Sequence, residues 1–156
     1  MTAYSDIEQS VLDIDWFAVD RDGNIAHLTT AARRALPTAV ASSKEDLEAL
    51  LEFFKALPET GGGSKENPAY RTQIAALASR FGEICLDDSL SMADRGLYSF
   101  DASDKRDRHG SYVLVATPGK PIHVDQLPGH VQRLVLRARI QAVRFADTNE
   151  FAPPAE

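Results

Sequence analysis

Two β-prone runs near the start of the chain surround an Asp-Gly pair: Trp16-Phe17-Ala18-Val19, then Asp20-Arg21-Asp22-Gly23-Asn24, then Ile25-Ala26-His27-Leu28. Asp-Gly accepts the positive φ that a tight turn between antiparallel strands requires. Apolar residues occupy both faces of each run, as in strands that are covered on both sides. The stretch therefore predicts a β-hairpin in the interior of the molecule, and the rest of the chain is expected to pack around it.

A first helix is predicted shortly after the hairpin. Ser42 and Glu45 stand in the S-x-x-E pattern of a capping box, in which hydroxyl and carboxylate satisfy backbone N–H groups at a helix start. Apolar residues then recur with the spacing of one helical face: Leu47, Leu50, Leu51 and Phe54. Because proline cannot continue a helix, we expect this one to end before Pro58.

A second helix is predicted after a glycine-rich segment, 60–65. In that segment Ser64 precedes Lys65, whereas a phosphate-binding loop needs Gly-Lys followed by Ser or Thr, so we interpret it as a flexible linker. Asn67 suits the N-cap position and Pro68 the first helical position. The buried side of this helix is expected to carry Tyr70, Ile74, Leu77, Ala78 and Phe81.

The second half of the chain is rich in β-prone residues. Runs 96–101 and 111–116 predict a pair of strands, joined by a polar loop, 102–110, that we expect to be exposed and mobile. Segment 131–143 fits both a strand and a helix. We favour a short helix there, followed by a last strand near 143–145.

These segments together predict a fold of the α+β class. We expect a single domain over residues 1–150, with an antiparallel sheet built from hairpins and two or three helices packed on one face. Residues 151–156 are rich in proline and alanine, and we expect them to form a frayed tail.

Composition and charge exclude several classes of protein. The 156 residues suit about one domain, and no apolar run approaches the ~18 residues of a membrane span. The start of the chain lacks the basic and apolar regions of a secretory signal, so a cytoplasmic protein is expected. A single cysteine, Cys85, cannot form an intramolecular disulfide or a multi-cysteine zinc site. The formal charge of −6 opposes nucleic acids and anionic membranes as main partners.

One enzymatic interpretation comes from the hairpin turn. Asp20 and Asp22, after a strand and before Gly23, resemble the first motif of haloacid-dehalogenase-type phosphatases. That resemblance implies Asp20 as nucleophile, Asp22 as general acid/base and Mg²⁺ between the oxyanions. Asn24 replaces the threonine of the motif, and a strand pattern resumes at once. We therefore prefer a structural turn, with no cofactor and no metal, and keep the phosphatase as the alternative.

A binding function is the interpretation we favour. Acidic residues outnumber basic ones 16 to 8 in residues 1–94, whereas 7 acidic residues face 9 basic ones in 95–156. We expect partner-binding side chains on the exposed side of the first helix and in the polar loop: Glu45, Glu48, Glu52, Asp104, Arg106 and Arg108.

The hairpin also carries a resemblance to a group of proteins. Asp15-Trp16-Phe17-Ala18-Val19-Asp20, followed by Gly23-x-Ile25-Ala26-His27, is similar to the opening of uncharacterised small bacterial proteins. Some of these look like immunity proteins of bacterial toxin systems, which bind and block a toxin without chemistry. Segments 96–101 and 112–118 are similar to later parts of the same proteins, so the resemblance spans about half the chain. It implies a protein partner, such as a basic toxin, for the acidic part.

Overall fold

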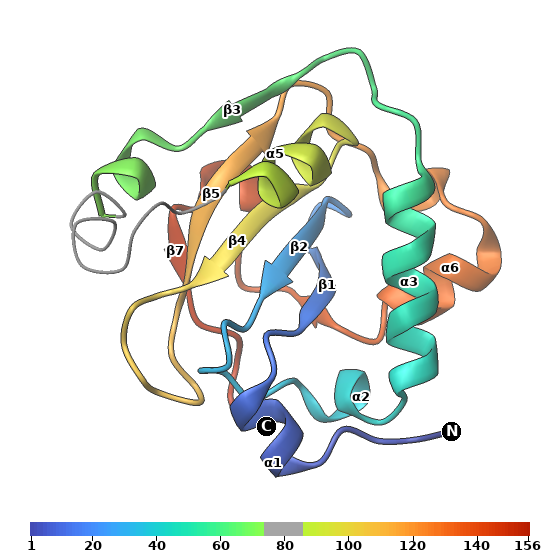
Figure 1. The fold of residues 1–156 in the computed structure, drawn as a ribbon. Coiled ribbons are helices and arrows are strands. Elements are labelled where there is room, and N and C mark those ends of the chain that lie inside the picture. The colour runs from blue at the N-terminus through green and yellow to red at the C-terminus, as the bar shows by residue number, and fades with distance from the viewer. Residues whose placement is uncertain (74–85) are drawn as a thin grey trace.

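Seven strands form one mixed sheet in the computed structural model, which describes residues 1–73 and 86–156 (Figure 1). The order across the sheet is β3-β5-β4-β2-β1-β6, and β7 also pairs with β5. The strands are β1 (Asp15–Asp20), β2 (Ile25–Thr29), β3 (Ser64–Glu66), β4 (Tyr98–Ala102), β5 (Tyr112–Pro118), β6 (Arg139–Ile140) and β7 (Glu150–Phe151). The sheet is mostly antiparallel, which confirms the predicted α+β class.

The predicted hairpin is present, with Trp16 opposite Leu28 and Val19 opposite Ile25. The sheet departs from a purely antiparallel arrangement because β2 pairs with β4, and β1 with β6, in parallel. Parallel neighbours need long crossover connections, and here the segment between β2 and β4 contains helices that cover the sheet. Hairpin patterns in a sequence carry no information about such pairings.

The described helices are α1 (Asp6–Val11), α2 (Thr38–Ala41), α3 (Lys44–Ala56), α5 (Asp87–Asp94) and α6 (Gly129–Val135), with helical residues also at 68–73. Helices α3, α5 and α6 pack against one face of the sheet, whereas α1 and α2 lie beyond the ends of the strands, at the bottom of Figure 1. The ring of Phe54 in α3 packs 4.6 Å from Phe17 of β1. On the same face, Tyr70 donates a hydrogen bond of 2.8 Å to Asp101 of β4. The helical layer therefore extends from β1 to β4 along one side.

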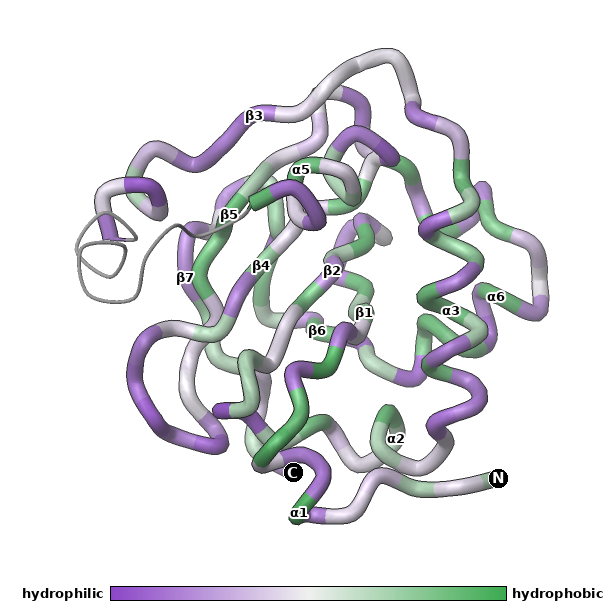
Figure 2. Tube along the Cα trace, viewed as in Figure 1, coloured by the Kyte–Doolittle hydropathy of each residue, from purple (hydrophilic) through white to green (hydrophobic). Residues whose placement is uncertain are grey.

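The opposite face of the sheet is covered by the end of the chain. Trp16, Leu28 and Phe100 lie in register there, and the ring of Phe145 packs 5.5 Å from Phe100. Phe145 belongs to a 3-10 turn, η2 (Phe145–Asp147), and not to the strand predicted near 143–145. Phe151 is buried in β7, so order extends beyond residue 150 into the segment expected to fray. Figure 2 shows the resulting contrast between a hydrophobic centre and hydrophilic outer loops.

Local helix signals were correct to within about one residue. Ser43, not Ser42, is the N-cap of α3 and accepts a hydrogen bond from the Asp46 N–H, because Ser42 instead donates to the Ala39 carbonyl. Leu47, Leu50 and Phe54 are buried as the stripe predicted. Of the second predicted helix, residues 68–73 are helical and the remainder lies outside the described residues.

The short helix predicted in segment 131–143 is confirmed as the end of α6, whereas the linker and the last strand differ from their predictions because of tertiary pairing. The end of the glycine-rich linker forms β3, which is ordered by antiparallel pairing with the end of β5. The ambiguous segment 131–143 divides into the end of α6 and the two-residue β6, which joins the free edge of β1. Helix α5 has a mixed polar and apolar sequence and carried no clear helical pattern.

Candidate functional site

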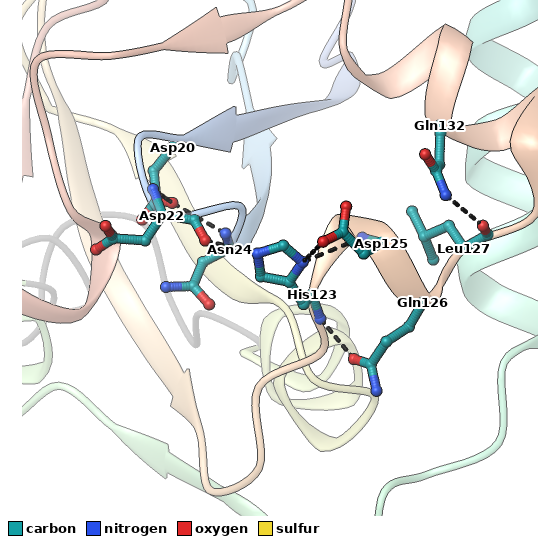
Figure 3. Close-up of polar contacts among 8 residues, drawn as sticks. All are labelled: Asp20, Asp22, Asn24, His123, Asp125, Gln126, Leu127 and Gln132. Carbon is teal, nitrogen blue, oxygen red and sulfur yellow. Dashed lines mark hydrogen bonds and ion pairs between the residues drawn. The ribbon is translucent and has the colours of Figure 1, made fainter.

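Asp20 is the last residue of β1, and its carboxylate organises the hairpin turn (Figure 3). Its Oδ1 accepts the N–H groups of Asp22 and Asn24, each at 2.9 Å. Its Oδ2 accepts the Phe145 N–H at 2.8 Å, and the residue is 0% exposed. A carboxylate that accepts three backbone N–H groups closes a turn and also fixes the C-terminal segment against it.

The His123 side chain packs on the outer side of the same turn and contacts its backbone. Its Nε2 lies 2.7 Å from the Asp22 carbonyl oxygen, and its Nδ1 accepts the Asp125 N–H at 3.1 Å. Because Nδ1 accepts, Nε2 carries the proton and donates to the carbonyl. A Cβ on Gly23, whose φ is +85°, would lie 2.1 Å from this Nε2, so glycine is required here. His123 and Asp125 thus form a cap on η1 (Val124–Gln126) that supports the hairpin.

This geometry assigns Asp20 a structural role. A nucleophilic carboxylate needs an oxygen that reaches substrate, whereas both Asp20 oxygens accept internal hydrogen bonds in a buried position. The turn also leads into an antiparallel strand, whereas a doubly wound phosphatase needs strands that alternate with helices. The Asp22 carboxylate is half-exposed and pairs with Arg144 Nε at 3.2 Å. Within residues 1–73 and 86–156, no three metal-binding side chains gather into one group.

A second polar cluster crosses three strands on the helical face. His27 of β2 contacts Asp15 of β1 through Nε2 at 2.7 Å and Ser99 of β4 through Nδ1 at 3.0 Å. The three residue types match a hydrolytic triad, but His27 is 1% exposed and Ser99 is fully buried. The serine hydroxyl therefore cannot meet a substrate, and the cluster serves to satisfy buried polar groups. Sequence reasoning missed it because the link between His27 and Ser99 depends on the parallel β2–β4 pairing.

The three glutamates predicted on the first helix all project into solvent. Glu45, Glu48 and Glu52 lie along the exposed side of α3, opposite its buried stripe. Glu45 also accepts the Thr2 N–H at 2.9 Å. That hydrogen bond, with further hydrogen bonding from its own N–H, lowers the pKa of Glu45 to about 2. Glu45 therefore adds a negative charge to the solvent-facing side of α3 at neutral pH.

A buried arginine, Arg34, binds the backbone of the polar loop, 102–110, that was predicted to be mobile. The Arg34 guanidinium donates to the carbonyls of Ser103, Lys105 and Ser111 at 2.7 to 3.3 Å, and also to the Ser103 hydroxyl. Burial lowers the pKa of Arg34, and its guanidinium lies 6.0 Å from the centre of the Tyr112 ring. Arginine provides five N–H donors in a fixed plane, which suits a set of converging carbonyls. Sequence reasoning missed this residue, since nothing in its neighbourhood marks it as buried.

The side chains of this loop nevertheless face outward. Asp104, Arg106 and Arg108 are exposed, and Arg108 lies 3.7 Å from Asp6 of α1. The loop and α3 lie on different sides of the molecule, with α1 between them in the view of Figure 1. The structure therefore places the two predicted binding regions on separate surfaces that α1 connects.

Comparison with protein-family models, curated proteins and solved structures finds no match for this chain. The resemblance of the hairpin to small bacterial proteins consequently stays a prediction. Within the described parts of the chain, no helix has the length and apolar character needed to cross a membrane.

Proposed function

We propose that this chain is a non-catalytic, cytoplasmic protein-binding domain that recognises a basic protein, in the manner of an immunity protein that neutralises a toxin. The observation that carries the proposal is the solvent-facing row of Glu45, Glu48 and Glu52 on a helix whose other side is anchored in the core. A rigid acidic face is suited to bind a basic surface. The side chains that resemble catalytic groups, in contrast, are committed to internal hydrogen bonds.

The charge distribution supports the same proposal. Acidic residues exceed basic ones two to one in residues 1–94, so the field of this part attracts cations. Such a field accelerates association with a basic partner at low ionic strength. Screening shortens its range from ~30 Å at 0.01 M salt to ~8 Å at 0.15 M.

A charge-reversal experiment tests the proposal. The partner is first identified by co-purification, and its association rate is then measured at these two salt concentrations. Glu48→Lys/Glu52→Lys should slow association at low salt by about tenfold or more, because both side chains are exposed and neither belongs to the buried stripe. Glu59→Lys/Asp147→Lys is the matched control, with the same change in net charge at exposed positions elsewhere. Equal rates for all three proteins, independent of salt, would contradict an acidic binding face.

A further inference from the structure

Exposed hydrophobic side chains gather near the N-terminus. Among the described residues, the large hydrophobic side chains that are exposed are Met1, Ile7, Val11 and Leu12. Ile7 is 76% exposed, Val11 66% and Leu12 43%. Contiguous exposed apolar side chains on a folded domain mark interaction surfaces.

Helix α1 turns a polar side chain toward the protein interior and apolar side chains toward solvent, the opposite of a typical surface helix. Its polar residue Gln9 is buried, where its side chain donates to the Tyr4 carbonyl at 3.2 Å and accepts the Leu36 N–H at 2.8 Å. Ile7 and Val11, four residues apart, share the outward side. A surface helix ordinarily turns its apolar side to the core, so this orientation has a cost in the free protein that binding of a partner would offset.

The orientation of α1 is held firmly. Ser5 caps the helix by accepting the Glu8 N–H at 3.1 Å, and the Glu8 side chain accepts the Ser5 N–H in return. Glu8 also pairs with Lys44 at the start of α3. Because polar contacts fix the inner side, Ile7 and Val11 are presented on a preformed surface, which reduces the entropic cost of binding.

The chain segment that carries this apolar surface is acidic, and two basic side chains lie beside it: Lys44 pairs with Glu8, and Arg108 lies 3.7 Å from Asp6. Asp6, Glu8, Asp13 and Asp15 all precede Arg21, the first basic residue of the chain. Next to Leu12 lies a groove of about 200 Å³, which Asp13, Asp15 and Glu48 line together with Tyr4, Leu12, Ile14, Leu47 and Leu51. Burial of its carboxyl and the nearby Asp101 and Asp15 raise the pKa of Asp13. A cation in the groove would relieve that repulsion.

We propose that Ile7, Val11 and Leu12 form the hydrophobic anchor of the partner surface, and that the occupant is a basic amphipathic segment of the partner protein. Its apolar residues would cover this anchor, and a lysine or arginine would enter the groove beside Leu12. Apolar walls suit the aliphatic stem of such a side chain, and carboxylates suit its charged end. The inference rests on the proposed function and deepens it, since it names where the partner docks.

Binding of synthetic peptides tests the docking surface. The probe is an amphipathic helical peptide with leucine on one side and lysine on the other, compared with versions in which all leucines are serine or all lysines are glutamate. We expect only the first peptide to bind, with amide shift changes centred on Ile7, Val11, Leu12 and Glu48. Equal binding of the serine peptide, or shift changes centred elsewhere, would overturn the proposal.

Two variants separate the anchor from the acidic face. Ile7→Ser/Val11→Ser should weaken binding of the amphipathic peptide by about tenfold or more, whereas Ala49→Ser/Ala56→Ser, at exposed positions of α3, should leave it unchanged. If the first variant binds like wild type while Glu48→Lys/Glu52→Lys does not, the anchor is wrong and the proposed function stands. If both bind like wild type, both proposals fall. Amide shifts of Ile7 and Val11 that change with protein concentration alone would assign the surface to a second copy of this chain.

Discussion

At the scale of single residues, Asp20 shows how a motif with catalytic appearance can be a structural one. Its carboxylate accepts the N–H groups of Asp22 and Asn24 in the turn, and also that of Phe145, which follows Asp20 by 125 residues. The short-range part of this network is ordinary turn chemistry and follows from the sequence. The long-range part ties the turn to the segment that covers the second face of the sheet, and only the folded chain reveals it.

Replacement of Asp20 by asparagine should therefore lower stability. An amide offers one acceptor oxygen and a donor NH₂ group, so either Phe145 or the turn would face a donor in place of an acceptor. We expect a loss of about 1–3 kcal/mol in the free energy of unfolding, measured by urea denaturation. Asp22→Asn is the control, because the Asp22 carboxylate is half-exposed and its partner among the described residues is Arg144. Unchanged stability together with loss of a Mg²⁺-dependent phosphatase activity would instead support the catalytic alternative.

At the scale of elements, some segments are stabilised by their own local sequence signals, whereas others are ordered by contacts with distant segments. Helix α3 carries its own cap and buried stripe, and its position was predicted almost correctly. Strand β3 and the loop after β4 have no comparable signal of their own. The first is ordered by pairing with β5 and the second by the guanidinium of Arg34.

Removal of this guanidinium should release the loop. Arg34→Met keeps much of the side-chain volume but leaves the carbonyls of Ser103, Lys105 and Ser111 without their donor. We expect faster hydrogen exchange at the amides of Ser103 and Gly110, which bond within the loop, and a loss of about 1–3 kcal/mol in unfolding free energy. Arg33→Met is the matched control, because among the described residues the Arg33 guanidinium donates to one carbonyl of the loop, that of Ser103, whereas Arg34 donates to three carbonyls around it. Equal exchange in the two variants would show that the loop is ordered without Arg34.

At the scale of the whole molecule, one large hydrophobic cluster contains side chains from both faces of the sheet, beside a smaller cluster of Tyr70, Val113 and Val115. Trp16 is fully buried and its indole N–H donates to the Tyr112 hydroxyl at 3.1 Å, linking β1 to β5. The other face of β1 packs on α3 through Phe17. Because β1 contributes to both layers, neither layer can separate without exposing the other.

Unfolding should consequently be a single transition. Trp16 is the only tryptophan, so its fluorescence reports the sheet interior, while far-UV circular dichroism also reports the helices. Both signals should give the same denaturation midpoint and the same slope, as expected for one cooperative domain of about this size. Two separated midpoints would show that the helical layer and the sheet unfold as independent units.

Local and compositional features of this protein follow from the amino-acid sequence alone. They include the β1–β2 turn, the buried stripe of α3, the α+β class and the acidic character of residues 1–94. The folded chain, in contrast, was needed to reveal the parallel pairings, the burial of Arg34, the His27–Ser99 contact and the outward direction of Ile7 and Val11. Side-chain periodicity records which residues share a face, whereas burial and pairing depend on which distant segment comes to cover that face.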